Sequence, residues 1–255
     1  MKKVLQLSRL TPGLDAFLQN YPKGTWNEFR DFEGGSAVKE LIQALMDKQR
    51  GLCAYCEINL LDSDREIEHF HPKHDDRQGA NYWTFQLANL FAACKGGSYP
   101  YSSNSSRSLP RTKQNLSCGA KKADKILDDI IVNPASLSAI PSVFLVSSTG
   151  EIKIDSDNCK ITKTDEKRVI ATINELNLNC QRLRNARAIV WQQLEDYFQQ
   201  GAETGQTDQE TLSQIASIYL LPDDNGKLPA FFTTIRVFCG AIGEELLAES
   251  PGVWL

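Results

Sequence analysis

A pair of cysteines separated by two residues, Cys53 and Cys56, constrains the fold of this chain more than any other feature. CxxC is the tightest spacing at which one turn of the chain supplies two thiolates to a tetrahedral zinc ion. The candidate second pair, Cys94 and Cys118, is separated by 23 residues, and all three histidines lie between the pairs, within residues 69–74. The sequence therefore predicts a metal-stapled core with a long insertion in the second pair. The alternative is that these cysteines are unrelated thiols of the core.

Length and composition place the chain among globular proteins. Its 255 residues suffice for one large domain or two small ones, and 41% of them are hydrophobic. No apolar run approaches the ~18 residues of a membrane span, and Gln6 and Arg9 interrupt the first apolar stretch before an export signal can form. We therefore expect a cytoplasmic protein without a membrane partner. In that reducing compartment its seven cysteines are metal ligands or free thiols rather than a disulfide framework.

Hydrophobic periodicity predicts an α+β chain in three parts. These are an N-terminal helical lead-in over 1–50, a mixed core over 51–160, and a mainly helical region over 161–255 that would dock a partner. The expected elements are a helix capped by Ser36, a short strand around Ile67, a helix before Cys94, a hairpin over 142–154, and helices from near 164, over about 180–201, over 207–222 behind a Thr207–Glu210 capping box, and over roughly 230–249.

Residues between the cysteine pairs carry the chemistry of phosphodiester hydrolysis. That reaction needs a general base for the attacking water, a hard oxygen ligand for a divalent ion, and a group that orients the base. His69, Glu68 and Asn89 supply these three types of group. The alternative for Glu68 is a surface carboxylate, because on a strand its side chain alternates away from that of His69.

This stretch resembles the HNH endonuclease family. The family motif runs from CxxC to an acidic residue with His, then Asn-Leu, a closing Cys pair and a basic or His position. Its counterparts here are Cys53, Cys56, Glu68, His69, Asn89, Leu90, Cys94, Cys118 and Lys122. The resemblance implies a ββα-metal core, with a structural Zn²⁺ on the four cysteines and a catalytic Mg²⁺ or Mn²⁺. It also implies that His69 is the base on a strand, that Asn89 fixes its imidazole, and that the helix after Cys118 completes the site.

Segments over residues 40–190 are similar to one branch of this family. QRGLCAYCE, IEHFHPK, IIVNP and TINELNLNCQRLRNAR resemble the HNH nuclease subunits of bacterial anti-phage systems, namely the PtuB component of Septu and its retron-associated relatives. The resemblance implies a PtuA-like ATPase partner of the ABC/SMC class. In a retron it also implies a reverse transcriptase and its msDNA as partners.

The chain departs from the family pattern at the end of the motif. Gly119 stands where Asn is common, and Lys122 or Lys121 stands where a metal-ligating His is frequent. A protonated lysine cannot hold a hard cation, so we expect Lys122 to contact phosphate or the transition state. His71 would share a strand face with His69 and is a candidate metal ligand. The alternative is a hydrogen-bonded histidine before Pro72.

The long segment before Cys118 predicts a local basic patch. The chain as a whole has a net charge of −4, so a nucleic-acid site must be local. Residues 107–125 contain six cationic side chains and one acidic side chain, Asp124. The cationic residues are Arg107, Arg111, Lys113, Lys121, Lys122 and Lys125. We expect the first four to contact nucleic-acid phosphates. The alternative is a solvated loop.

These observations predict a metal-dependent HNH endonuclease that acts on nucleic acid, with DNA favoured, in anti-phage defence under the control of a partner ATPase. One alternative is an RNase effector of a retron system, directed at tRNA, because the chemistry acts on the phosphodiester and does not read the sugar. Another is a zinc-stabilised binding module without catalysis. A binding module without catalysis has no need of Glu68, His69 and Asn89 together. The presence of this set therefore favours a nuclease over a binding module.

Overall fold

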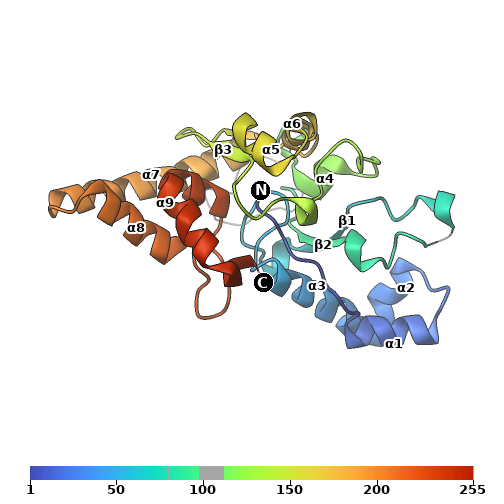
Figure 1. Ribbon diagram of the computed structural model, residues 1–255. Helices are drawn as coiled ribbons and strands as arrows, with labels where there is room; N and C mark the ends of the chain where they lie inside the picture. The colour runs from blue at the N-terminus through green and yellow to red at the C-terminus, as the bar shows by residue number, and fades with distance from the viewer. Residues whose placement is uncertain (80, 98–111, 255) are drawn as a thin grey trace.

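The computed structural model describes residues 1–79, 81–97 and 112–254 of the chain (Figure 1). The helices are α1 (Pro12–Asn20), α2 (Trp26–Asp31), α3 (Ser36–Lys48), α4 (Cys118–Lys122), α5 (Ser156–Thr162), α6 (Glu166–Glu175), α7 (Gln181–Glu203), α8 (Asp208–Tyr219) and α9 (Phe232–Glu249). The strands are β1 (Glu66–His69), β2 (Leu90–Ala93), β3 (Phe144–Val146) and β4 (Ile152–Ile154). The chain is thus α+β and mainly helical, as predicted. Within these residues, no helix has the length and apolar character needed to cross a membrane.

Helices lie at the two ends of the molecule, and the small sheets lie between them. Helices α1 to α3 form one end and α7 to α9 the other, with β1, β2 and α4 between (Figure 1). Strands β1 and β2 pair antiparallel with His69 opposite Leu90 and Glu66 opposite Ala93. Strands β3 and β4 form the predicted hairpin. Because β2 leads directly into Cys94 and α4 begins at Cys118, both cysteines lie beside the first sheet.

Side chains at the N-cap stabilise the first turn of several helices. Thr207 and Glu210 form the predicted capping box of α8, and Thr25 with Glu28 forms another at α2 that the sequence interpretation missed. Thr11 caps α1 ahead of Pro12. Helix α3 confirms the predicted amphipathic helix, but its N-cap is Gly35 in a left-handed conformation, and Ser36 is its first residue.

Two buried hydrophobic clusters stabilise the fold. The larger one takes its members from Met1 to Phe231 and includes both faces of β2. The smaller one joins α7, α8 and α9 through side chains that include Leu194, Ile215 and Phe232. Burial of apolar surface at about 25 cal/mol per Å² is the main force that holds these elements together. The larger cluster draws on all three predicted parts of the chain, and their boundaries stay a prediction.

The segment before Cys94 corrects the sequence interpretation. A helix was expected before Cys94, whereas the structure has a short 3₁₀ turn over Leu87–Asn89 and then β2. All four residues of β2 are buried, so the strand shows no alternation of polar and apolar residues. A short apolar run of this kind cannot be assigned to helix or strand by periodicity alone.

Candidate metal centre and active site

The four cysteines of the predicted metal site lie together in the core. Cys53, Cys56, Cys94 and Cys118 are all buried, and their sulfur atoms lie within 4.8 Å of one another. The Cys56–Cys94 and Cys53–Cys118 sulfur pairs are 3.6 and 4.0 Å apart. Zn–S bonds of about 2.3 Å in a tetrahedron place sulfurs roughly 3.8 Å apart. The four thiols are therefore spaced as the ligands of one metal ion.

Local backbone geometry builds both halves of this cluster. The amide of Cys53 donates to the carbonyl of Ile58, and Glu57 closes the turn with a φ of 63°. The amide of Cys94 donates to the sulfur of Cys53 at 3.4 Å. In the second half, a Cβ at Gly96 would overlap the carbonyl oxygen of Ser117. Only glycine therefore lets the chain after Cys94 lie against the residue before Cys118.

Arg182 is a buried cation beside the cysteine cluster. Its side chain donates from Nη2 to the Ser117 hydroxyl at 2.8 Å. Burial opposes its charge, but the neighbouring sulfurs of Cys56 and Cys94 raise the pKa of Arg182 overall. Four thiolates on a divalent ion would carry a net negative charge, which a buried guanidinium at this place would compensate. Arg182 is buried, so its guanidinium serves the interior of the protein rather than its surface.

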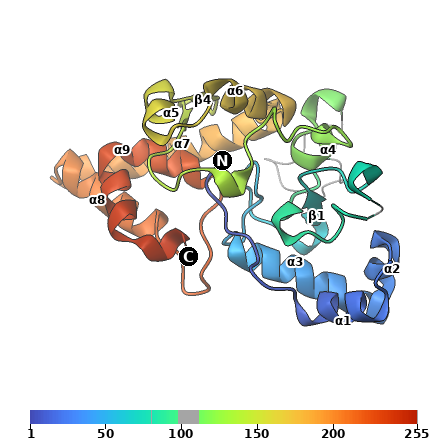
Figure 2. The ribbon, with the colours of Figure 1, turned by 45° about the vertical axis from the view of Figure 1, so that its right-hand side comes forward.

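A cavity of about 330 Å³ lies between β1 and α4. Figure 2 shows the two elements side by side. From β1 and the turn that follows, its lining includes Glu66, Glu68, His69 and Lys73, and from α4 it includes Gly119 and Lys122. The structure thus brings three of the four predicted catalytic residues to one cavity.

The His69 imidazole is buried, and one of its two nitrogens is fully engaged. Nε2 lies 3.0 Å from the carbonyl oxygen of Thr84, and because a carbonyl only accepts, Nε2 carries the hydrogen. The ring packs edge-on against Trp26 with centroids 4.6 Å apart. Burial lowers the pKa of His69 to about 3. The imidazole is therefore neutral at pH 7, with the lone pair on Nδ1.

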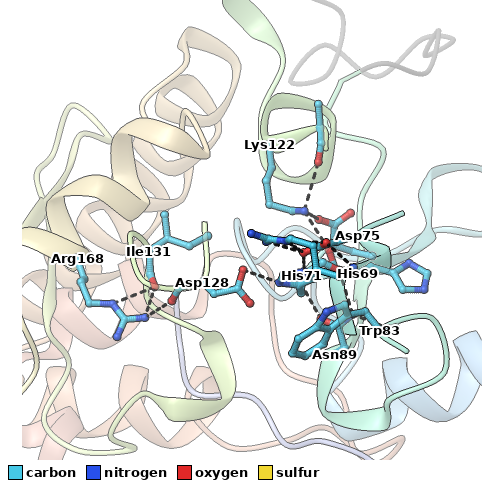
Figure 3. A network of polar contacts seen from close by, with 12 residues as sticks. His69, His71, Asp75, Trp83, Asn89, Lys122, Asp128, Ile131 and Arg168 are labelled. Atoms are coloured by element: carbon cyan, nitrogen blue, oxygen red, sulfur yellow. Dashed lines mark hydrogen bonds and ion pairs between the residues drawn. The ribbon is translucent and has the colours of Figure 1, made fainter. Parts of the chain in front are cut away.

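Asn89 orders the backbone beside His69 rather than its ring (Figure 3). Its Oδ1 accepts from the amide of His71 at 2.6 Å, and its Nδ2 donates to the carbonyls of His71 and Trp83 at 3.0 and 2.8 Å. The expected contact with the imidazole is instead made by the Thr84 carbonyl. The side-chain amide of Asn89 can join the segment after β1 to residue 83 because it offers both hydrogen-bond donors and an acceptor.

Lys122 is 2% exposed and donates inside the protein. Its Nζ lies 3.1 Å from Oε1 of Glu68, 3.0 Å from the carbonyl oxygen of His69 and 3.3 Å from that of Ala123. The ammonium group donates hydrogen bonds to the two carbonyl oxygens and forms an ion pair with the Glu68 carboxylate. Lys122 thus holds Glu68 and the end of β1 against α4, and its expected contact with phosphate stays a prediction.

Glu66 is a site residue that the sequence interpretation missed. Two residues before Glu68 on β1, it lies on the same face of the strand, and this alternation is the signal that could have found it. A Cβ at Gly119 would lie 2.5 Å from Oε2 of Glu68 and 3.4 Å from Oε1 of Glu66. Burial, followed by the charge of Glu68, raises the pKa of Glu66 to about 7. The missing side chain at position 119 therefore leaves room for two neighbouring carboxylates.

His71 does not line this cavity, and its role as a metal ligand stays a prediction. Strand β1 ends at His69, so the expected alternation stops there. Nε2 of His71 lies 2.8 Å from Asp75, Nδ1 lies 2.9 Å from Asp128, and the ring stacks on Trp83 with centroids 4.1 Å apart (Figure 3). Both ring nitrogens of His71 therefore contact carboxylates in this structure.

The predicted basic patch falls largely outside the described part of the chain. Arg107 and Arg111 belong to residues 98–111, which the structure does not describe. Lys113 is exposed in a 3₁₀ turn, and Lys121 is half-buried in α4. Their contact with nucleic acid stays a prediction.

Comparison with known proteins gives one curated relative, and no protein-family model matches the chain. The relative is "Retron Ec83 putative HNH endonuclease" of Escherichia coli, 36% identical over 200 residues, which cover 68% of this chain and 74% of the relative. The similarity agrees with the cysteine spacing and with the placement of Glu68 and His69 at one cavity. The chain is a nuclease that belongs to the HNH endonuclease family.

Proposed function

We propose that this enzyme hydrolyses nucleic-acid phosphodiester bonds by a metal-dependent mechanism in the cavity between β1 and α4. In this proposal β1, β2 and α4 form the ββα-metal core of the family, and the four cysteines hold a structural Zn²⁺. The observation that carries the proposal is the hydrogen bond from Nε2 of His69 to the carbonyl of Thr84 at 3.0 Å. It leaves a neutral imidazole whose other nitrogen can accept a proton.

His69 acts as the general base. Nδ1 takes a proton from the attacking water, and the Thr84 carbonyl stabilises the imidazolium that results because Nε2 already donates to it. Asn89 keeps the surrounding backbone in place through its bonds to residues 71 and 83. The ring cannot rotate without losing its bond to Thr84 and its packing on Trp26.

Glu68 and Glu66 would hold the catalytic Mg²⁺ or Mn²⁺. Carboxylate oxygens are the ligands these ions prefer, and Mg²⁺ sites commonly use one or two carboxylates together with substrate phosphates. The fit rests on the two carboxylates beside Gly119, where no side chain competes for the space. When bound, the ion supplies a Lewis acid that stabilises charge on the phosphate. Lys122 positions Glu68 for this role, since it holds Oε1 at 3.1 Å.

The similarity to a retron nuclease supports a role in anti-phage defence. We propose that a PtuA-like ATPase of the ABC/SMC class regulates this nuclease, and that a retron reverse transcriptase and its msDNA belong to the same system. DNA is the favoured substrate, and RNA, including tRNA, is the alternative because the residues of the cavity act on the phosphodiester.

Cleavage by the purified protein tests the proposal. Wild type, His69→Ala and the matched control His74→Ala, which changes an exposed histidine outside the cavity, are incubated with DNA and with RNA in Mg²⁺ or Mn²⁺, alone and with the ATPase. We expect wild type and His74→Ala to cleave equally and His69→Ala to lose ~10²–10⁴-fold in rate.

Two results would contradict the proposal. Cleavage by His69→Ala at the wild-type rate would place the base elsewhere. Absence of cleavage of both substrates by wild type under every condition, with folded zinc-loaded protein, would favour a binding module without catalysis.

A further inference from the structure

A second, larger cavity continues from the first. Its volume is about 770 Å³, and it shares Glu66, Ile67 and Lys73 with the 330 Å³ cavity. It lies between β1 and helices α2 and α3, which contribute Trp26 and Val38 among other residues. The two cavities thus form one groove that passes the edge of β1 and leads to His69. We call the larger part the α2–α3 groove.

The charge of the α2–α3 groove is opposite to that of the protein. Five cationic and two acidic side chains line it, in a chain whose net charge is −4. The cationic residues are Arg30, Lys39, Arg65, Lys73 and Lys95, and the acidic ones are Asp62 and Glu66. A concave surface of one sign concentrates the field of its charges and attracts ligands of the other sign.

Two of these cations are free to bind a ligand. Arg30 and Lys39 are exposed, and within the described residues no carboxylate pairs with either. Arg30 comes from the last turn of α2 and Lys39 from the first turn of α3, so they approach the groove from two different helices. Arg65, in contrast, is paired with Asp62 at 3.0 Å.

The remaining lining of the α2–α3 groove is apolar. Trp26, Val38, Ile42 and Ile67 contribute to it, and Trp26 also contacts the ring of His69. Proteins that bind single strands combine a cationic path for the backbone with aromatic and apolar surface for the bases. The groove offers both, and its far end opens into the cavity of the proposed general base.

We propose that the α2–α3 groove binds the single strand of nucleic acid that flanks the scissile phosphodiester. Arg30 and Lys39 contact its phosphates, and the wall formed by Trp26, Val38 and Ile42 contacts its bases. This inference rests on the proposed function, and it adds a substrate-binding surface on the N-terminal helices, away from the patch that the sequence predicts around Lys113 and Lys121.

Binding of a labelled oligonucleotide tests this proposal separately from cleavage. The double variant Arg30→Gln/Lys39→Gln is compared with Lys48→Gln/Lys167→Gln, which removes two exposed cations outside the groove. Each change is made in the full chain in a His69→Ala background, so that the probe stays intact. The probes are single-stranded DNA and RNA of one mixed sequence, titrated over a series of salt concentrations.

Loss of two phosphate contacts reduces the slope of log K against log salt by about 1.4 for a single strand. Taking equal affinity of variant and parent at about 1 M salt as the reference, this slope difference means that the dissociation constant of the variant is higher than that of its parent by roughly tenfold at 0.2 M salt and roughly 60-fold at 0.05 M salt. The control variant should bind as its parent does. Unchanged zinc content and melting temperature exclude misfolding as the cause.

The possible results separate this inference from the proposed function. Equal affinity and equal salt slope in the groove variant and the control would overturn the groove, even if wild type cleaves nucleic acid. No binding of either probe by the parent at low salt would overturn it as well. A groove-specific loss of binding in a protein that never cleaves would support the groove and refute the nuclease mechanism.

Discussion

A Cβ atom on Gly119 would lie 2.5 Å from Oε2 of Glu68. Gly119, which follows Cys118, therefore faces the carboxylate of Glu68, the neighbour of the proposed base His69 on β1. Any larger side chain at position 119 would enter the space that Glu68 fills here. The glycine and the glutamate are thus complementary in volume.

Gly119→Ala should lower activity through the position of Glu68. The added methyl group must displace a carboxylate that Lys122 holds, so we expect the Mg²⁺ concentration for half-maximal cleavage to rise several-fold and the rate to fall about tenfold. A metal titration of cleavage measures both. The matched control is Gly252→Ala, since a Cβ there meets nothing within 4 Å. Equal behaviour of the two variants would show that the carboxylate moves aside without cost.

Cys94→Ser should remove the structural metal. We expect wild type to hold one zinc ion per chain and the variant to hold much less, with a loss of more than about 4 kcal/mol in the free energy of unfolding, because metal binding is part of folding. Elemental analysis and chemical denaturation measure these quantities. Cys239→Ala is the control, since Cys239 is buried outside the cluster. Wild type without zinc, purified in the absence of chelator, would refute the site.

Lys122→Met should destabilise the protein more than the double variant Lys122→Met/Glu68→Gln. Lys122 and Glu68 are 2% and 13% exposed in their side chains, and removal of one partner of a buried pair leaves the other charge uncompensated, at a cost of about 3–5 kcal/mol. The double variant removes both charges and should recover part of this loss without recovering cleavage. Additive losses in a denaturation cycle would show that the pair is not coupled.

Asp128→Asn should loosen the turn after β1 from the segment that precedes α6. Asp128 Oδ2 contacts His71, and its carbonyl accepts from Arg168 of α6 (Figure 3). Only the side-chain contact changes, so we expect a loss of about 1–2 kcal/mol in the free energy of unfolding. Asp129→Asn, at an exposed neighbouring position, is the control. An equal effect of both variants would mean that the bridge to His71 contributes nothing.

His69 should make the protein less stable as the pH falls from 7. Burial lowers its folded pKa to about 3, whereas an unfolded histidine titrates near 6.5. Between these values the unfolded chain binds the extra proton, so stability rises with pH through this window and is lost below it. At pH 5 the loss is about 2 kcal/mol relative to pH 7. His69→Gln should flatten the curve by that amount, and parallel curves would refute the neutral buried imidazole.

Local sequence determined several elements of this protein because the interactions that form them lie within a few residues. The Thr207–Glu210 box begins α8, the turn at residues 148–150 joins the two strands of the hairpin, and the CxxC turn places two thiols together. In each case the partner atoms are close along the chain, so tertiary packing had little to decide.

Only the tertiary structure decided which atoms meet at the site. The partner of the His69 ring is a carbonyl 15 residues away, that of Lys122 Nζ is a strand end 53 residues away, and His71 is paired with a carboxylate 57 residues away. The α2–α3 groove likewise takes its cations from residues 30 to 95. Spacing in the sequence does not specify these pairs, because packing of the buried core sets which distant backbone and side-chain groups face one another.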